Sequence, residues 1–303
     1  MVRVTRFPLD AHHVRLSPDA TKAAWTSDLG LHIVDSLRAP EAVVEDLAWS
    51  PDGAFVAAST ADMGLKGGHR QVRWLPAYIG DPSGSTSGAS FAWEPKGVWL
   101  VVADPWSGEI RRHNTEVEKQ QIVCAVRDQG DPLRAPSLAV SPDGRRLAFS
   151  AMLEDHAELR VVDLPSGEPR LVTELPRTSI HGIPFWTPDS RSLGVLVVDL
   201  EAGSSGLILV RDLQGEGEIL HSSELILPLR RPAFSPSGKT LAFLDVEKPD
   251  HEFTKSGPPS LALLEGGRLR RITKPGELSG DLRFLDEERL VADGDGAAFV
   301  VSV

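Results

Sequence analysis

The sequence predicts an all-β fold, a seven-bladed β-propeller of four-stranded antiparallel blades whose last blade is closed by the N-terminal strand. A short turn motif recurs seven times along the chain, and an apolar, strand-like run follows each copy. The spacing between copies suits one four-stranded unit per repeat. We therefore expect residues 1–303 to form a single propeller domain.

The repeated motif is an apolar or aromatic residue, then Ser-Pro-Asp-Gly or a variant of it, then a second apolar run. The copies begin at Leu16, Trp49, Trp93, Val140, Trp186, Phe234 and Phe284. Proline presets the second position of a tight turn, aspartate tolerates the third, and glycine accepts the conformation at the exit. The third copy is degenerate, and the seventh has lost its proline. Each motif therefore predicts a hairpin turn rather than a site.

The spacing of the motifs sets the size of each blade. The motif prolines are Pro18, Pro51, Pro95, Pro142, Pro188 and Pro236, which lie 33 to 48 residues apart. That length accommodates four short strands and their turns. The sixth residue after the proline is small in five copies, which would let neighbouring sheets approach closely. These residues are Ala24, Ala57, Ala148, Gly194 and Ala242, and Val101 is the exception.

The ends of the chain predict how the ring closes. The seventh unit finishes with residues 297–303 after only three strands, whereas residues 2–7 alternate in polarity and precede the first motif. We expect residues 2–7 to pair with residues 297–302, because closure removes open sheet edges. The motif aromatics should pack at equivalent ends of the innermost strands. They are Trp49, Trp93, Trp186, Phe234 and Phe284.

Trp-Ser-Pro-Asp-Gly before an apolar strand, followed by turns rich in Asp and Gly, resembles the TolB-type propeller repeat over essentially the whole chain. That repeat occurs in periplasmic translocation proteins, in the propeller domains of prolyl oligopeptidase relatives and in many other propellers. The resemblance therefore implies a fold and leaves the function open. The sequence has neither the α/β domain that precedes the propeller in TolB nor a hydrolase domain, and it lacks the Trp-Asp and Gly-His signature of WD repeats.

Composition narrows the class of partner. A content of 41% hydrophobic and 25% charged residues is that of a globular protein. The net charge of −11 opposes binding to phosphate backbones and to anionic lipid, so we expect neither a nucleic acid nor a membrane partner. No apolar stretch has the length of a signal peptide or a membrane span, which favours the cytoplasm. Cys124 lies in an apolar run and is expected to be buried without a chemical role.

Two basic runs, residues 111–113 and 268–271, alternate like exposed edge strands. Edge strands carry charge that prevents pairing between sheets of different molecules. Neither run therefore requires a binding partner.

Two local patterns suggest chemistry and are better explained as turns. Residues 84–88 differ in spacing from a Gly-x-Ser-x-Gly nucleophile elbow, and no helix follows them. Residues 293–296 offer only two carboxylates to a calcium ion and suit an Asp/Gly hairpin. We predict no catalytic residue and no cofactor.

The segments leading into the inner strands carry polar side chains that would surround the channel mouth. They are His12, His13, Glu45, Asp46, His181, Arg230, Arg231 and Asp281. No local motif fixes a metal geometry among them, so a metal site stays open as an alternative. Convergent polar groups in a concave site are where a ligand binds. We select His13, His181, Arg231 and Asp281 as ligand-binding candidates.

Long loops are expected on the same face of the disc. The connections between second and third strands are long at residues 59–69 and 245–259, and in a propeller they emerge beside the channel mouth, opposite the motif turns. Long loops on a rigid scaffold are where binding residues concentrate. Asp250 and His251 in the second loop complete the candidate set. The alternative is that both loops are tolerated insertions.

The resulting hypothesis is a non-catalytic binding or scaffolding propeller, which engages a protein or a small ligand through its loop-bearing face and channel mouth. The alternative is an enzyme, a hydrolase or lactonase-like protein, with a polar or metal-binding site in the central channel. No recognisable pairing of nucleophile and base appears in the sequence, which favours the first hypothesis.

Overall fold

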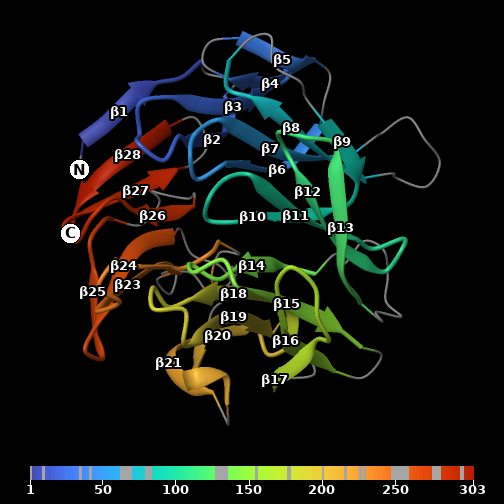
Figure 1. Cartoon of the computed structure of the whole chain (residues 1–303). Coiled ribbons are helices and arrows are strands. Elements are labelled where there is room, and N and C mark those ends of the chain that lie inside the picture. The colour runs from blue at the N-terminus through green and yellow to red at the C-terminus, as the bar shows by residue number, and fades with distance from the viewer. Residues whose placement is uncertain are drawn as a thin grey trace.

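Seven four-stranded antiparallel sheets surround a central axis, as the ring of blades in Figure 1 shows. The computed structural model describes residues 2–8, 11–33, 36–40, 43–61, 70–78, 84–126, 136–153, 156–175, 179–199, 201–214, 217–224, 227, 230–246, 259–274, 281–293 and 297–303. For residues 2–6, 36–40, 152, 179–181 and 297 it describes the backbone alone. The predicted seven-bladed all-β propeller is confirmed.

The first four blades follow one another along the chain. Blade 1 consists of β2 (His12–Leu16), β3 (Ala23–Ser27), β4 (Gly30–Ile33) and β5 (Ser36–Pro40). Blade 2 consists of β6 (Val43–Trp49), β7 (Phe55–Ala61), β8 (Arg70–Pro76) and β9 (Gly84–Ser87). Blade 3 consists of β10 (Ser90–Trp93), β11 (Trp99–Asp104), β12 (Glu109–Asn114) and β13 (Lys119–Ala125). Blade 4 consists of β14 (Leu138–Val140), β15 (Arg146–Met152), β16 (Ala157–Asp163) and β17 (Arg170–Leu175).

The remaining blades complete the ring. Blade 5 consists of β18 (Ser179–Trp186), β19 (Leu193–Asp199), β20 (Ser204–Val210) and β21 (Glu218–Ser223), with the short 3-10 helix η1 (Arg211–Leu213) after β20. Blade 6 consists of β22 (Ala233–Phe234), β23 (Thr240–Val246), β24 (Pro259–Glu265) and β25 (Arg268–Arg271). Blade 7 consists of β26 (Leu282–Phe284), β27 (Arg289–Asp293), β28 (Ala297–Ser302) and β1 (Val2–Arg6).

The two ends of the chain close the ring as predicted. Strand β1 pairs antiparallel with β28, with Val2 opposite Val300 and Arg6 opposite Ala297, so the N-terminal strand is the outermost strand of blade 7. In Figure 1 the blue β1 lies beside the red β28. The last blade therefore joins both ends of the chain in one sheet.

The motif turns of blades 1, 2, 4 and 5 share one set of hydrogen bonds, which blade 4 illustrates. The Ser141 hydroxyl donates to Asp143 (2.6 Å) and accepts from the Arg146 amide (3.0 Å). Gly144 has a φ of +71°, a left-handed conformation that glycine adopts without strain. A Cβ at Gly144 would lie 3.5 Å from Pro95 of blade 3, so the turns of neighbouring blades pack on one another.

The three motif tryptophans link blades 2, 3 and 5 to the blade before each of them. Indole Nε1 groups donate to carbonyls of the preceding inner strand, in the pairs Trp49 to Arg15 (3.0 Å), Trp93 to Ala48 (3.3 Å) and Trp186 to Ala139 (3.0 Å). All five motif aromatics lie at the last position of an inner strand, as predicted. Trp49 and Trp186 are buried, whereas Trp93, Phe234 and Phe284 are half-buried.

Small residues occupy the second strands where the sequence places them. Ala24, Ala57, Ala148 and Ala242 are fully buried between sheets. At Gly194 a Cβ would lie 2.3 Å from the ring of Phe185 on the neighbouring strand, so that aromatic side chain fills the space. The close approach there is within one blade.

The two basic runs have different outcomes. Strand β25, residues 268–271, is the exposed outer strand of blade 6, as predicted. The prediction for residues 111–113 is wrong, because β12 is the third strand of blade 3 and β13 covers it. His113 is buried there, and burial lowers the pKa of its imidazole, with a further contribution from the charge of Arg111. Alternating charge does not by itself distinguish an edge strand from the strand next to it.

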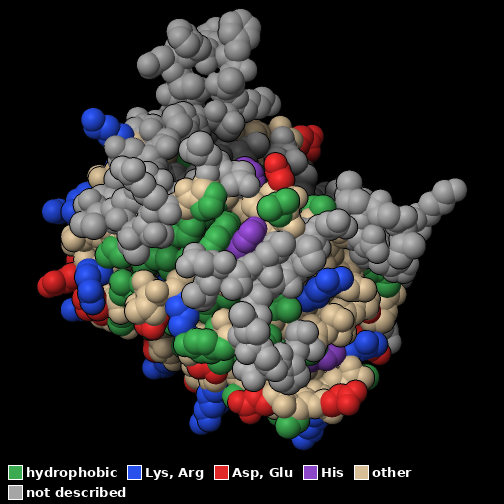
Figure 2. Space-filling model, turned by 90° about the horizontal axis from the view of Figure 1, so that it is seen from above, with side chains coloured by type: hydrophobic (Ala, Val, Ile, Leu, Met, Phe, Trp, Pro, Cys, Tyr) green, Lys and Arg blue, Asp and Glu red, His purple; other side chains and the backbone are tan. Residues whose placement is uncertain are grey.

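The side of the molecule that Figure 2 draws has mixed charge among its described residues. In the view of Figure 2, basic and acidic side chains are interspersed with apolar ones. Within the part of the chain that the structure describes, no helix has the length and apolarity required to cross a membrane. Cys124 is buried, as expected, and burial raises the pKa of its thiol to about 12.

Candidate functional site

A ring of seven residues surrounds the axis, one from each blade, in or just before the inner strand and three positions before the first residue of the motif. We call it the central ring, and it consists of His13, Asp46, Ser90, Ser137, Ile183, Arg231 and Asp281. All seven are exposed or half-buried. Their neighbours one position later are all buried, namely Val14, Leu47, Phe91, Leu138, Pro184, Pro232 and Leu282. Because side chains alternate along a strand, the ring residues are the ones that turn toward solvent at this level.

Arg15 fixes the wall of the ring between blades 7, 1 and 2. Its side chain is buried, with Nε donating to the carbonyl of Leu47 (3.1 Å) and Nη1 donating to that of Val14 (3.1 Å). The remaining nitrogen, Nη2, forms an ion pair with Asp281. A buried guanidinium must have such partners, since an unpaired charge in this position would be strongly destabilising. The charge of Arg15 is therefore used within the fold.

A second carboxyl group lies behind this ion pair. Asp293 is buried and accepts a hydrogen bond from the Leu16 amide (3.3 Å). Burial raises the pKa of Asp293 to about 7, although Arg15 and Arg283 both act in the opposite direction. Arg283 is itself held by the carbonyls of Ser17 (3.0 Å) and Pro18 (2.9 Å). These groups join blade 7 to blade 1.

Asp46 lies on the ring with most of its hydrogen-bonding capacity unused. Its carboxylate accepts the amide of Leu47 (2.8 Å), and its side chain is exposed. Protein nevertheless surrounds it closely, and the resulting loss of water raises its pKa, with the charge of Asp281 acting in the same direction. Arg15 and Arg231 act against this shift. Asp46 is therefore a carboxyl group with unused acceptor capacity, and its surroundings disfavour its ionisation unless a cation binds to it.

Arg231 reaches from blade 6 to blade 4 across the ring. Its Nη2 donates to the carbonyl of Leu138 (2.6 Å), which holds the guanidinium in place, while the side chain stays exposed. Asp46 and Arg231 form no ion pair with each other in the described structure, although Arg231 is close enough to affect the pKa of Asp46. The ring thus presents a carboxyl group and a guanidinium group that do not pair with each other in the described structure.

The structure brings three of the six candidate residues to one level. His13, Arg231 and Asp281 are members of the central ring, and His13 adopts a φ of 45° at a bulge in β2. His181 lies two positions earlier along β18, with its backbone opposite Val198, and so does not share the level of the ring. Asp250 and His251 lie outside the described residues.

Two arginines of the ring wall were not predicted from the sequence. Arg15 and Arg283 occupy the position immediately before the first residue of the motif, where the other blades have Ala48, Ala92, Ala139, Phe185 and Ala233. A charged residue at a position that is apolar in the other five blades was the signal that could have identified them. Asp46 belonged to the wider set of polar residues expected at the mouth, and its unused capacity becomes visible only when its partners are known.

Other candidate sites are weaker. A cavity of about 530 Å³ on the rim of blade 3 is lined by Glu109, Arg111, Gln120, Gln121 and Ile122. Arg111 and Glu109 already form an ion pair there (2.6 Å). Among the residues that the structure describes, no three or more His, Cys, Asp or Glu side chains converge as a metal site would require.

Comparison with known proteins supports the fold and goes no further. No protein-family model matches the sequence, and no curated protein matches it. TolB from Acinetobacter baumannii is similar in structure, with a TM-score of 0.54 and 16% identity over 88% of this chain and 64% of that chain. The β-propeller domain of Cps50 (Swd1) from Myceliophteria thermophila has a TM-score of 0.61 and 15% identity, over 100% of this chain and 99% of that chain.

An enzyme shares the same architecture. Oligogalacturonate lyase from Vibrio parahaemolyticus has a TM-score of 0.61 and 13% identity, over 99% of this chain and 93% of that chain. At these identities the similarity confirms a TolB-like and WD-like propeller fold. Because a lyase shares the fold, architecture alone does not choose between binding and catalysis.

Proposed function

We propose that this chain is a non-catalytic binding or scaffolding propeller, which engages a protein or a small ligand through the central ring and the loops beside it. The proposal rests on the unused hydrogen-bonding capacity of two exposed ring residues, Asp46 and Arg231. Each is exposed on the ring and makes a single hydrogen bond within the described part of the chain, whereas Arg15, Arg283 and Asp281 are engaged in joining blades. Groups with unused capacity in a rigid frame are suited to bind a partner. The cytoplasmic location expected from the sequence belongs to the same proposal.

Shortening the loop between β23 and β24 tests whether the proposed face of the disc binds the partner. Val246 and Pro259 are directly opposite each other in the sheet, so a short turn can replace residues 247–258 without disturbing either strand. We expect the shortened protein to melt like the parent and to capture its partner more weakly. Unchanged capture would remove the loop from the proposed binding face.

Photo-crosslinking distinguishes the ring from the rest of the disc. A crosslinking amino acid at Ser137 samples the ring, and the same group at exposed Lys96 or Ile122 samples the motif turns or the rim. In lysate of the native organism, we expect one dominant adduct at position 137 and little at the control positions. Adducts that are absent at position 137, or stronger at positions 96 and 122, would overturn the proposed face.

A channel enzyme is the second candidate, and one observation favours it. Two carboxyl groups near the ring, Asp46 and Asp293, both have raised pKa values, which is common among catalytic acids and bases. A screen of chromogenic esters and lactones, together with metal analysis of the purified protein, tests this candidate. Turnover that Asp46→Asn abolishes, and that the matched rim variant Asp163→Asn does not, would favour the enzyme.

A further inference from the structure

Opposite charges that do not pair with each other suggest a ligand that carries both. We propose that the central ring binds a small zwitterion, with its ammonium group on Asp46 and its carboxylate on Arg231. This inference rests on the proposed binding role of the ring and adds the chemical class of the ligand. It depends on three features of the ring: the unused acceptors of Asp46, the orientation of Arg231 and the positions of these residues on different blades.

The Asp46 side of the ring suits a cation. An ionised carboxylate has about four acceptor sites, and the Leu47 amide uses one of them. Asp281 adds negative potential nearby, although its own charge is paired with Arg15. An ammonium group at Asp46 would supply the missing donors and would also relieve the repulsion between the two carboxylates.

The Arg231 side suits a carboxylate. A guanidinium carries five N–H donors in a planar fork, and one nitrogen, Nη2, donates to Leu138. That hydrogen bond fixes the orientation of the group, so less conformational freedom is lost when a ligand binds. Two parallel hydrogen bonds from arginine are the preferred arrangement for a carboxylate.

The spacing of the blades keeps the two charges apart. Asp46 belongs to blade 2 and Arg231 to blade 6, with blades 1 and 7 between them on one side of the ring. On the other side, Ser90 and Ser137 contribute neutral hydroxyl groups, and the Ser90 hydroxyl donates to the carbonyl of Pro136 (2.5 Å). A lone cation would meet the positive charge of Arg231, and a lone anion would meet the negative charge of the Asp46 carboxylate. A ligand with both charges meets a favourable partner at each end.

The probes are unbranched amino acids of increasing length, from glycine to 6-aminohexanoate, each compared with the amine and the carboxylate of matching length. We expect calorimetric titration of the full chain to show an optimum at one length. Each singly charged analogue should bind at least about tenfold more weakly, since it loses one charged hydrogen-bonding group. Equal binding of all three types, or no binding at concentrations up to roughly 50 mM, would overturn the inference.

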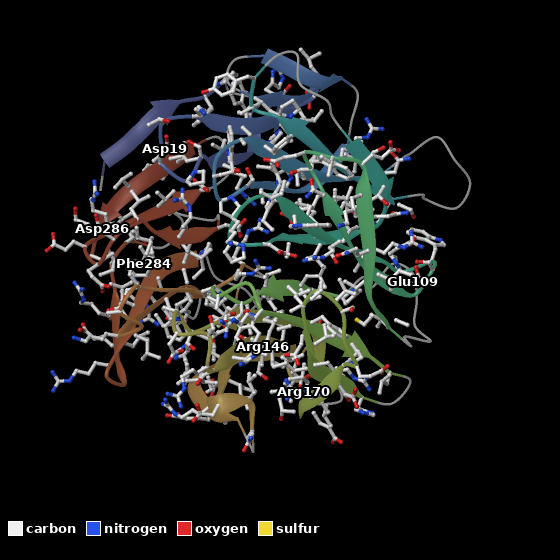
Figure 3. All side chains as sticks on the ribbon, in the orientation of Figure 1. Asp19, Glu109, Arg146, Arg170, Phe284 and Asp286 are labelled. Atoms are coloured by element: carbon white, nitrogen blue, oxygen red, sulfur yellow. The ribbon has the colours of Figure 1, made fainter. Side chains whose placement is uncertain are left out.

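Paired variants assign each end of the ligand. In Asp46→Asn the zwitterion should bind no better than the carboxylate, and in Arg231→Gln no better than the amine. The matched controls are Asp163→Asn and Arg170→Gln, an exposed ion pair (3.7 Å) that includes Arg170, labelled near β17 in Figure 3. Equal losses in the rim controls would contradict the assignment, and melting curves verify that each variant is folded.

The outcomes separate this inference from the proposed function. If no zwitterion binds but position 137 still crosslinks one dominant partner, the ring is a protein-binding site and the ligand class proposed here is wrong. If zwitterions bind with the expected dependence on Asp46 and Arg231 and no crosslinked protein appears, the ligand class holds and the protein-binding form of the proposed function fails.

Discussion

The two ends of the inner strands differ in how alike the blades are: several blades repeat the same residues and contacts at the motif end, whereas the residues differ from blade to blade at the central ring. At the motif end, blades repeat the same contacts: a serine or threonine hydroxyl donates to the turn aspartate at 2.5 to 2.6 Å in blades 1, 2, 4 and 5. Three positions earlier, at the central ring, the blades differ. They contribute a histidine, two serines, an isoleucine, an arginine and two aspartates.

This difference distinguishes residues that stabilise the fold from residues that are available to bind a ligand. A contact made in blade after blade serves the packing that all blades share, so its loss should cost stability. A polar group present once, at a position where the frame does not require it, is available for a ligand. Variants at the motif end and its closure should therefore destabilise the protein, whereas variants at unpaired ring residues should not.

The largest effect is expected from opening the ring. Deleting residues 1–7 removes β1 and leaves β28 as an unpaired edge in blade 7. We expect the melting temperature to fall by more than about 10 °C, because several kcal/mol of strand pairing are lost. Calorimetry measures the shift, and adding a synthetic peptide of residues 1–7 should recover part of it. An unchanged melt would show that closure does not depend on this strand.

The next largest effect concerns the links between blades. Trp186→Ala removes a buried aromatic side chain and its hydrogen bond to the carbonyl of Ala139, and should cost about 3 to 5 kcal/mol in urea unfolding. Trp186→Phe keeps most of the packing and should cost less, about 1 to 3 kcal/mol for the carbonyl left without its donor. The half-exposed Trp106 is the control, and Trp106→Ala should cost under about 1 kcal/mol. Equal losses at both tryptophans would contradict the role of the indole contacts.

The fold was predictable because its signals are local and repeated. The Ser-Pro-Asp-Gly turns, the small residues of the second strands and the alternating N-terminal segment each act within a few residues, and seven copies reinforce one another. The exception was residues 111–113, where a strand next to the edge has the same alternation as an edge strand. Only pairing with β13 distinguishes the two.

The site was less predictable because its contacts join distant parts of the chain. Asp293 bonds to the Leu16 amide, and Arg231 bonds to the Leu138 carbonyl, in pairs that the sequence does not mark. Position relative to the motif identified His13, Arg231 and Asp281 as ring residues. Whether a charged side chain is engaged or available depends on partners in other blades, as the contrast between Arg15 and Asp46 shows.

The ionisation of Asp293, which lies behind the ring, should make the free energy of unfolding depend on pH. Its native pKa is raised to about 7 from 3.8, so the unfolded chain releases this proton at lower pH than the native protein does. Ionisation of Asp293 therefore destabilises the native state progressively above pH 4, and the loss is complete just above pH 7. We expect a loss of roughly 2 to 4 kcal/mol over this interval, with Arg15, Arg283 and Asp281 as the facing charges.

Asp293→Asn isolates this contribution from the other titrating groups. The amide cannot ionise and can still accept the hydrogen bond from the Leu16 amide. The difference in unfolding free energy between the parent and the variant should therefore shift in favour of the variant as pH rises from 4 to 8. A constant difference over that range would show that Asp293 is ionised throughout in the native protein.

The smallest effects on stability are expected at two exposed aspartates, Asp19 and Asp46. Asp19 of the blade 1 turn, labelled in Figure 3, accepts hydrogen bonds from the hydroxyls of Ser17 (2.6 Å) and Thr21 (2.7 Å), which lower its pKa to about 2. Its contribution to stability should be present above about pH 4 and lost as pH falls through 2, so Asp19→Ala should cost about 1 kcal/mol at pH 7.

Asp46→Asn should change stability by less than about 0.5 kcal/mol at pH 7, because the side chain keeps an acceptor for the Leu47 amide, the one hydrogen bond that Asp46 makes within the described residues. A small gain is the expected sign, since the raised pKa of Asp46 means that its surroundings disfavour ionisation. Urea unfolding at pH 7 measures both variants under one condition. If Asp46→Asn cost as much as Asp19→Ala, Asp46 would be a structural group like the turn aspartates, and the distinction between the two ends of the inner strands would fail at the residue that most depends on it.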